Sequence, residues 1–156
     1  MIDPLALGAT LYMPATRPDL PSRTFGGGIP DLRSCVVCLE DAVHAREVGL
    51  ALARLHALLA GLPEHPSVHI FVRPRDPAML ARILRMPGAE RLAGFVLPKV
   101  TPETLPLWLG QLVSPNHSIM PTLETREAFD QAELRRLRDQ LLAVQNRGAD
   151  DQDRRQ

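Results

Sequence analysis

The stretch Val68-His-Ile-Phe-Val-Arg-Pro-Arg-Asp-Pro-Ala-Met-Leu-Ala-Arg-Ile-Leu84 contains the pattern that decides the fold. Its first residues form an apolar run of strand length that ends at Arg73-Pro74. Asp76 then precedes Pro77, and this order is typical of a helix with a capping carboxylate and proline at its first position. The stretch therefore predicts a strand over 68–72 followed by a helix over 77–84.

The same order of strand and helix recurs along the chain. Apolar runs predict strands at 6–13, 35–39, 68–72, 94–97 and 118–123, and amphipathic segments predict helices at 45–59, 77–84, 102–112 and 128–144. The apolar runs contain few polar residues, which favours strands that are buried on both faces. Alternation with helices indicates right-handed crossovers, so the predicted fold class is α/β with a parallel sheet.

Two short motifs have alternative interpretations. The irregular segment 17–33 contains Gly26-Gly27-Gly28, which matches neither common phosphate-binding pattern, so we favour a flexible turn over a phosphate cradle. Within this segment we expect at most one short helical turn. Cys35 and Cys38 have the spacing of a redox pair or half a zinc site, but they lie inside an apolar run. We therefore predict buried core thiols in a reducing compartment.

Composition excludes several classes of protein. The 156 residues are 45% hydrophobic and 23% charged, which is ordinary for a soluble globular domain. Lys and Arg together number 18, as do Asp and Glu, so no global charge favours nucleic acid or an acidic membrane. The sequence has no stretch that resembles a membrane span or a secretory leader, so we expect a cytoplasmic protein with neither nucleic acid nor membrane as partner.

Charged residues follow the predicted strands with unusual regularity. They are Arg17, Glu40, Asp41, Arg73, Arg75, Lys99 and Glu124. Because ligands of parallel α/β proteins collect at the carboxyl ends of the strands, this placement predicts a polar site suited to an anionic substrate and a hard cation. The alternatives are a helix cap for Glu40-Asp41, a surface position or an Asp76 partner for Arg75, and a structural ion pair for Lys99.

Five phrases in fixed order carry a family resemblance. They are Leu-Tyr-Met-Pro-Ala-Thr-Arg-Pro at 11–18, Leu-Glu-Asp-Ala-Val at 39–43, Phe-Val-Arg-Pro at 71–74, Val-Leu-Pro-Lys-Val at 96–100 and Met-Pro-Thr-Leu-Glu-Thr at 120–125. Together they resemble the HpcH/HpaI aldolase and citrate lyase β-subunit family, whose nearest branch contains carbon–carbon bond lyases of TIM-barrel fold. The resemblance implies a TIM-type (β/α) barrel over residues 1–144, incomplete at about five βα units.

The resemblance also implies the chemistry. A hydroxy acid or its coenzyme A thioester would be cleaved, by a retro-aldol or retro-Claisen step, to a 2-oxo acid and an acyl fragment. Glu124 corresponds to a family glutamate that binds Mg²⁺, and Arg73 to the arginine that grips the substrate carboxylate; both are the expected catalytic residues. An arginine suits that role because it clamps a carboxylate through two parallel hydrogen bonds.

The remaining roles implied by the resemblance concern substrate binding. Arg17 corresponds to an arginine that helps to bind the acid or the acyl-CoA, and Glu40 and Asp41 to a pair that supports the arginines. Lys99 corresponds to the lysine of the fourth-strand phrase and is expected at the substrate.

At two places the sequence departs from the family pattern, which limits the roles that can be transferred to its residues. Pro74-Arg75 stands where many members have Val-Asn, which adds a cation near the site. The second metal-binding carboxylate of the family lies on a sixth strand, and no strand pattern surrounds Asp150 or Asp151, so that role is not transferred. Residues 145–156 are almost entirely polar, which predicts a disordered tail.

These features leave the level of activity open. Our leading expectation is a lyase that is truncated relative to a full barrel of about 250 residues, with doubtful activity. The alternative is a non-catalytic half barrel that pairs with another chain, such as a second copy, through its open sheet edges.

Overall fold

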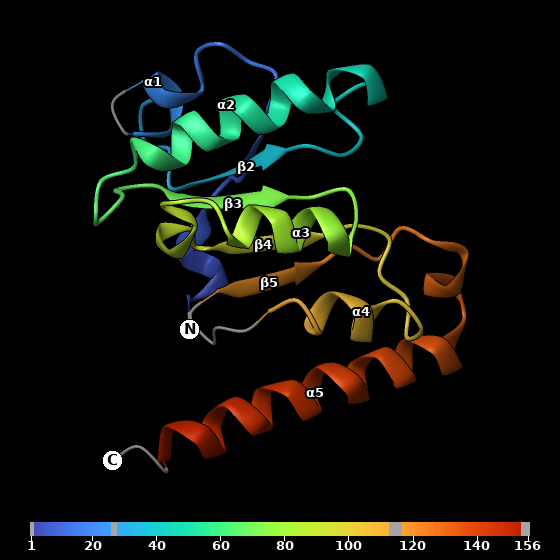
Figure 1. The fold of residues 1–156 in the computed structure, drawn as a ribbon. Helices are drawn as coiled ribbons and strands as arrows, with labels where there is room; N and C mark the ends of the chain where they lie inside the picture. Colours follow the sequence, from blue (N-terminus) through green and yellow to red (C-terminus); the bar gives the residue numbers. More distant parts are fainter. Residues whose placement is uncertain (1, 26–27, 113–116, 154–156) are drawn as a thin grey trace.

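The computed structural model describes residues 2–25, 28–112 and 117–153. Five parallel strands form one sheet in the order β1-β2-β3-β4-β5 (Figure 1). The strands are β1 (Leu11–Pro14), β2 (Ser34–Cys38), β3 (His69–Arg73), β4 (Gly94–Leu97) and β5 (Ser118–Pro121). The helices are α1 (Leu20–Thr24), α2 (Val48–Ala60), α3 (Pro77–Leu84), α4 (Leu105–Leu109) and α5 (Gln131–Asp153), with 3-10 turns η1 (Pro4–Leu7), η2 (Ala45–Glu47), η3 (Ala89–Arg91) and η4 (Arg126–Phe129).

The predicted fold class is confirmed. Each strand pairs in parallel with the next along the chain, and the strands β2, β3 and β4 are almost fully buried, as the apolar runs predicted. Within the described residues the sheet has two open edges, at β1 and β5, and its strands do not close into a barrel. The charged residues that follow the strands therefore meet at one edge of the sheet.

The segment that decided the fold forms as predicted. The side chain of Asp76 accepts a hydrogen bond of 2.7 Å from the backbone N–H of Met79, and Pro77 occupies the first turn. The helix begins at Pro77 and ends at Leu84, the predicted bounds. A capping carboxylate of this kind is worth about 1 kcal/mol, because it satisfies an N–H group that has no partner inside the helix.

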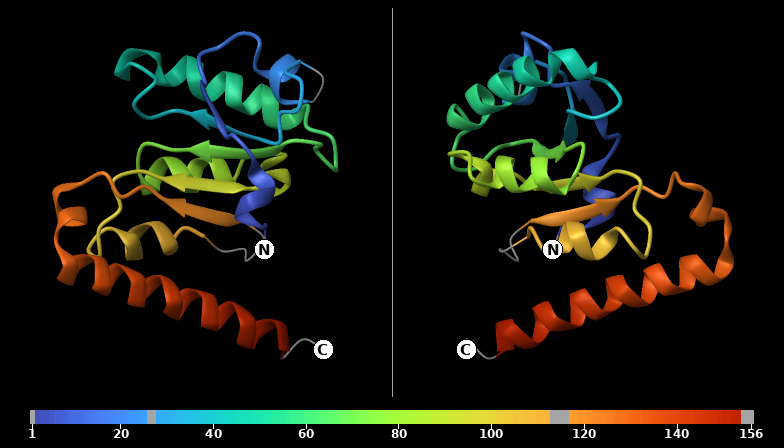
Figure 2. Two further views of the ribbon diagram at one scale, coloured as in Figure 1. Left: turned by 180° about the vertical axis from the view of Figure 1, so that it is seen from behind. Right: turned by 45° about the vertical axis from the view of Figure 1, so that its right-hand side comes forward.

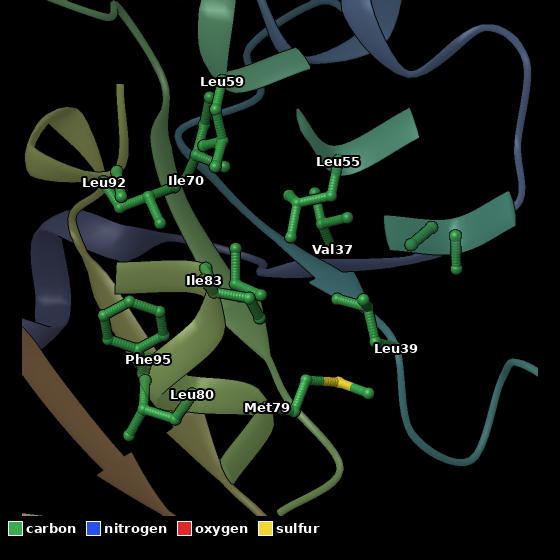
Figure 3. Packing of buried hydrophobic residues seen from close by; sticks show 14 of the residues in the cluster. Val37, Leu39, Leu55, Leu59, Ile70, Met79, Leu80, Ile83, Leu92 and Phe95 are labelled. Atoms are coloured by element: carbon green, nitrogen blue, oxygen red, sulfur yellow. The ribbon is translucent and has the colours of Figure 1, made fainter. Parts of the chain in front are cut away.

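One face of the sheet, which we call the helix face, carries most of the core. Helices α2, α3 and α4 cover it (Figure 1). Leu55 and Leu59 of α2 and Leu80 and Ile83 of α3 pack among strand residues such as Phe95, and all five are fully buried (Figure 3). Burial of each such side chain contributes about 1.5–3 kcal/mol, so this face supplies most of the stability.

The opposite face, which we call the inner face, has a small core. Val36, Phe71 and Val96, from three adjacent strands, form a small buried apolar cluster there, and Leu7 of η1 packs against them. The view from behind shows η1 on this side, away from α2, α3 and α4 (Figure 2). The inner face is therefore covered at the amino ends of the strands, while their carboxyl ends are left to polar groups.

Several predicted boundaries differ from those of the structure, and local hydrogen bonds explain two of the differences. The first strand begins at Leu11 rather than at residue 6, because Asp3 caps Leu5 N–H at 3.0 Å and residues 4–7 form a 3-10 turn. Helix α4 begins at Leu105 rather than at residue 102, because Thr101 and Thr104 bond each other's backbone N–H groups and form a turn first.

The last helix also differs from the prediction. A 3-10 turn, η4, ends before Asp130, whose carboxylate accepts a hydrogen bond of 2.7 Å from Ala132 N–H as α5 begins. Residues 145–153, which lie in the stretch predicted as a disordered tail, continue α5 to Asp153, and residues 154–156 lie outside the described residues. Residues 145–153 include several good helix formers, and adding residues to an existing helix is far less costly than starting one.

The remaining motif predictions have mixed outcomes. Cys35 and Cys38 are free and buried in β2, which confirms the prediction of core thiols. The expected short helical turn in segment 17–33 is α1. Gly26 and Gly27 lie outside the described residues. In the described part of the chain, every helix is too short or too polar to cross a membrane.

Candidate functional site

Five charged residues from four strand ends meet at the carboxyl edge of the sheet. Arg73 is the last residue of β3, and Glu40 and Asp41 follow β2 within three residues. Lys99 lies two residues after β4 and Glu124 three residues after β5. We call these five residues the carboxyl-edge cluster.

Arg73 is the centre of the carboxyl-edge cluster. It is only 7% exposed, and its Nη2 donates to Glu124 Oε1 at 2.6 Å, to Asp41 Oδ2 at 3.3 Å and lies 2.9 Å from Glu40 Oε2. Its Nε is buried and has no hydrogen-bond partner within the described residues. An unsatisfied buried N–H of a charged group is costly, so this atom is a natural donor for a bound carboxylate.

Lys99 holds two carboxylates through different groups. Its ammonium Nζ donates to Glu40 Oε1 at 2.5 Å and lies 3.5 Å from Asp41 Oδ1. Its backbone N–H donates to Glu124 Oε1 at 3.2 Å. The backbone of Lys99 is left-handed, with φ of 51°, a conformation that non-glycine residues adopt at a cost of about 1–3 kcal/mol. This conformation lets one residue contact carboxylates from β2 and β5 at once.

Glu40 is the anchor of the cluster on the β2 side. It is 8% exposed, and both of its carboxylate oxygens are engaged: Oε1 by Lys99, and Oε2 by Arg73 and by the backbone N–H of Asp41 at 2.9 Å. A buried carboxylate is tolerated only with such pairing. Glu40 therefore has a supporting role, while Asp41, at 60% side-chain exposure, faces solvent.

The electrostatics of the cluster reinforce the ion pairs. Burial disfavours the charge of Arg73, but the carboxylates of Glu40 and Glu124 outweigh it and raise the pKa of Arg73. The hydrogen bond to Glu40 raises the pKa of Lys99, and a hydrogen bond with Glu40 followed by the charges of Lys99 and Arg73 lowers the pKa of Asp41. With three carboxylates and two cations, the cluster has one negative charge in excess. This balance favours a cation at the exposed side of the site.

Arg17 is not among the residues that contact the cluster. Its Nε and Nη2 each donate to the carboxylate of Asp19 at 2.8 Å, and Arg23 contacts the same carboxylate at 3.1 Å. The two arginines hold the pKa of Asp19 far below its usual range. The Arg17 guanidinium is thus occupied by a neighbour two residues away, and its predicted role in substrate binding stays a prediction.

Arg75 corrects a different expectation. It is neither a surface residue nor a partner of Asp76, which caps α3. Its Nε donates to the carbonyl of Leu39 at 2.9 Å, and its Nη2 donates to the carbonyls of Glu40, at 3.3 Å, and Val43. No feature of the sequence indicates these bonds, because backbone carbonyls from a distant turn accept them.

Tyr12 is a further residue at the site that sequence reasoning missed. It pairs in register with Val36, which places its side chain on the inner face, and it is 49% exposed. Burial raises the pKa of Tyr12, the charge of Arg73 lowers it, and the charges of Cys38 and Glu124 raise it. The phenol therefore lies within electrostatic range of the cluster. Strand alternation opposite the buried Met13 was the available signal.

Among the carboxylates of the cluster, Glu124 is the one with an oxygen that could bind a metal ion. No three His, Cys, Asp or Glu side chains of the described residues are grouped closely enough to cage a metal. Glu40 is fully engaged, whereas the hydrogen bonds that Glu124 makes within the described chain all use Oε1. Mg²⁺ commonly takes one or two carboxylates and completes its octahedron with water and substrate, so Oε2 of Glu124 fits such an ion.

The chain was also compared with known proteins. A family model described as carbon–carbon bond lyase of the TIM-barrel fold matches residues 1–148. The chain belongs to this family. None of the curated proteins in the comparison matches it. For a carbon–carbon bond lyase of TIM-barrel fold, the active site is expected at the carboxyl ends of the strands, where the carboxyl-edge cluster lies.

Proposed function

We propose that this lyase acts in the manner of the citrate lyase β subunit. It cleaves a hydroxy acid, or its coenzyme A thioester, to a 2-oxo acid and an acyl fragment with the help of Mg²⁺. The observation that carries the proposal is the contact of 2.6 Å between Arg73 and Glu124, which are 51 residues apart in the chain. A substrate-clamping arginine and a carboxylate suited to a hard cation are thus side by side at the carboxyl edge.

Arg73 binds the substrate carboxylate in this proposal. Its buried Nε lacks a partner within the described residues, and a carboxylate placed there would gain a charge-assisted hydrogen bond. Glu40 and Asp41 hold the guanidinium in one orientation, so little conformational entropy is lost when the substrate binds. Lys99 adds positive charge at the same edge for a second anionic group of the substrate.

The reaction itself needs charge stabilisation on both fragments. The hydroxyl group of the substrate gives up its proton, its carbon becomes the oxo carbon, and the electrons of the breaking carbon–carbon bond pass to the acyl fragment as an enolate. The enolate then takes up a proton at carbon, so that the overall step neither gains nor loses a proton. A Mg²⁺ ion held by Glu124 would act as a Lewis acid on the oxygens of the 2-oxo acid. Arg73 and Lys99 keep the carboxylate groups of the substrate oriented while the carbon–carbon bond breaks.

Thermal unfolding with and without ligands tests the proposal. Mg²⁺ with oxaloacetate, a generic 2-oxo acid, should raise the Tm of the wild-type chain, because a ligand at about 100 times its Kd stabilises the folded state by about 2.7 kcal/mol. Glu124→Gln should lose the part of the shift that requires Mg²⁺, and Arg73→Lys the part that requires oxaloacetate. Glu90→Gln is the matched control, since Glu90 is an exposed glutamate that contacts Arg91.

Each outcome has a defined meaning. A wild-type Tm that ignores both ligands contradicts the proposal, as does a Glu124→Gln variant that keeps the full shift. If oxaloacetate raises the Tm of the wild type and Mg²⁺ adds nothing to that shift, the acid binds without metal. The proposed role of Glu124 as a Mg²⁺ ligand is then contradicted.

A second candidate function is assembly. The described sheet leaves β1 and β5 without outer neighbours, and Leu11 and Tyr12 of β1 are 38% and 49% exposed. Unpaired parallel edges are sites at which another chain can add strands. In this alternative the half barrel pairs with a second copy through its edges. Light scattering after size-exclusion chromatography distinguishes the two, since a discrete dimer favours assembly and a monomer excludes it.

A further inference from the structure

The turn that carries Glu40 and Asp41 is held by a side chain from the neighbouring strand end. The pairing of β2 with β3 continues to Leu39, whose N–H donates to the carbonyl of Arg73 at 2.9 Å. Pro74 has no N–H, and the N–H of Arg75 lies 3.4 Å from the sulfur of Met79. At this point the sheet ladder is replaced by the guanidinium of Arg75, whose Nε donates to the carbonyl of Leu39 at 2.9 Å.

The remaining bonds of Arg75 close the turn. Its Nη2 donates to the carbonyl of Glu40 at 3.3 Å and to that of Val43. The turn also has its own hydrogen bond, from Val43 N–H to the Glu40 carbonyl at 3.1 Å. One guanidinium therefore connects both ends of the turn 39–43 to β3. Its planar, multidentate geometry suits this task, which the single ammonium of a lysine performs less well.

We infer that Arg75 is a positioning residue for the carboxyl-edge cluster. It fixes the backbone of Glu40 and Asp41, and these carboxylates in turn orient Arg73 and Lys99. Arg75 has no ion pair with any of the three carboxylates in the described structure, so its influence passes through the backbone. The inference rests on the proposed function for its effect on ligand affinity, and on the hydrogen bonds alone for its effect on the turn.

The test compares Arg75→Ala and Arg75→Lys with a matched control, Arg91→Ala. Arg91 also donates from its guanidinium to a backbone carbonyl, that of Leu62, at 2.6 Å. That bond lies at the amino ends of the strands, away from the cluster. Removing it should cost a comparable amount of stability without affecting the cluster.

The first readout is amide hydrogen exchange of the wild type and the three variants without ligand. The N–H groups of Asp41 and Val43 bond to Glu40, so their protection reports order in the turn. In Arg75→Ala we expect both amides to exchange about tenfold faster or more, and in Arg75→Lys about threefold, because fewer hydrogen bonds restrain the turn. Arg91→Ala should leave the relative protection of these two amides unchanged. Wild-type protection in Arg75→Ala would overturn the inference.

The second readout is the Kd for oxaloacetate in the presence of Mg²⁺, measured by calorimetry well below each Tm. We expect Arg75→Ala to weaken binding about tenfold, Arg75→Lys to recover most of that loss and Arg91→Ala to bind as the wild type does. A lowered Tm with an unchanged Kd for Arg75→Ala would reduce Arg75 to a structural role. If the wild type itself does not bind, the proposed function falls, and the exchange measurement still decides whether Arg75 orders the turn.

Discussion

The two faces of the sheet differ in what they bury. The helix face packs Phe95, Leu55 and Ile83 into a continuous core under three helices (Figure 3). The inner face has only a small buried cluster of Val36, Phe71 and Val96 in the described chain, and at its rim charged groups replace apolar ones. The same strands supply both faces, because successive side chains point in opposite directions.

This division separates stability from chemistry. A side chain on the helix face is surrounded by packed neighbours and is worth its full burial energy. A charged residue at the rim of the inner face is held by other charges, whose attraction is largely offset by lost hydration. Changes on the helix face should therefore lower the free energy of unfolding, while changes at the rim should alter ligand binding and should lower stability only where they take a partner from a buried charge.

The largest effect that can break this comparison comes from two phenylalanines. Phe95 and Phe71 lie on neighbouring strands and are 0% and 1% exposed, but they face opposite sides. Phe95→Ala should lower the free energy of unfolding by about 3–5 kcal/mol, because a fixed core cannot collapse around the cavity. Phe71→Ala should cost at least about 1 kcal/mol less, because its smaller cluster can relax.

Urea unfolding of both variants measures this difference. The comparison is valid if the dependence on urea, the m-value, is the same in both variants, since a changed m-value reports a changed denatured or native state. Equal losses of unfolding free energy would mean that the inner face is packed as rigidly as the helix face. The proposed separation of stability and chemistry between the two faces would then be wrong.

A smaller effect is expected from the buried arginine. Arg73→Met keeps the volume but leaves Glu40, which is 8% exposed, without its guanidinium partner. The free energy of unfolding should fall by about 2–4 kcal/mol near neutral pH, because Glu40 would keep only Lys99 and the N–H of Asp41 as partners, and a buried carboxylate that loses part of its charge pairing is costly. Arg17→Met is the control. Arg17 pairs with Asp19 in solvent, so its loss should have a much smaller effect. Similar losses of unfolding free energy in the two variants would mean that the buried ion pairs of Arg73 stabilise the fold no more than an exposed ion pair does.

The sequence predicted those parts of the fold that depend on local chemistry. Strand β4 and helix α3 have the predicted bounds, since an unbroken apolar run and the Asp76-Pro77 pair each determine their structure locally. Strand β1 was predicted too long, because the cap provided by Asp3 makes a 3-10 turn from a segment whose apolar composition also suits a strand. Composition alone does not separate these two outcomes.

In the candidate site, too, the sequence predicted the positions of residues better than the contacts between distant parts of the chain. Placement at strand ends brought together Glu40, Asp41, Arg73, Lys99 and Glu124, because parallel strands share one carboxyl edge. Arg17 was expected at the same edge from this rule, but its guanidinium bonds to Asp19 in this structure, and its role in substrate binding stays a prediction. The strand-end rule also did not predict the hydrogen bonds of Arg75. Their acceptors are backbone carbonyls, which every residue has, so no residue type indicates them.

The smallest predicted effect concerns the exposed carboxylate at the rim. A hydrogen bond with Glu40, then the charges of Lys99 and Arg73, lowers the folded-state pKa of Asp41 below its unfolded value, which is about 3.9. A lowered pKa contributes stability that is fully present above the unfolded pKa and is lost as pH falls through the folded pKa. The wild-type free energy of unfolding should therefore decline below about pH 4 more steeply than that of Asp41→Asn.

Urea unfolding across the acid range, at low and at about 0.5 M salt, checks this prediction and relates it to the two faces. Asp41 is 60% exposed, so salt should screen its interactions and reduce the difference between wild type and Asp41→Asn. Curves for the two proteins that run parallel at low salt would mean that Asp41 titrates alike in the folded and unfolded chains. A difference that persists at high salt would instead mean that Asp41 is shielded from solvent ions as Glu40 is, and that the polar rim is closed in solution.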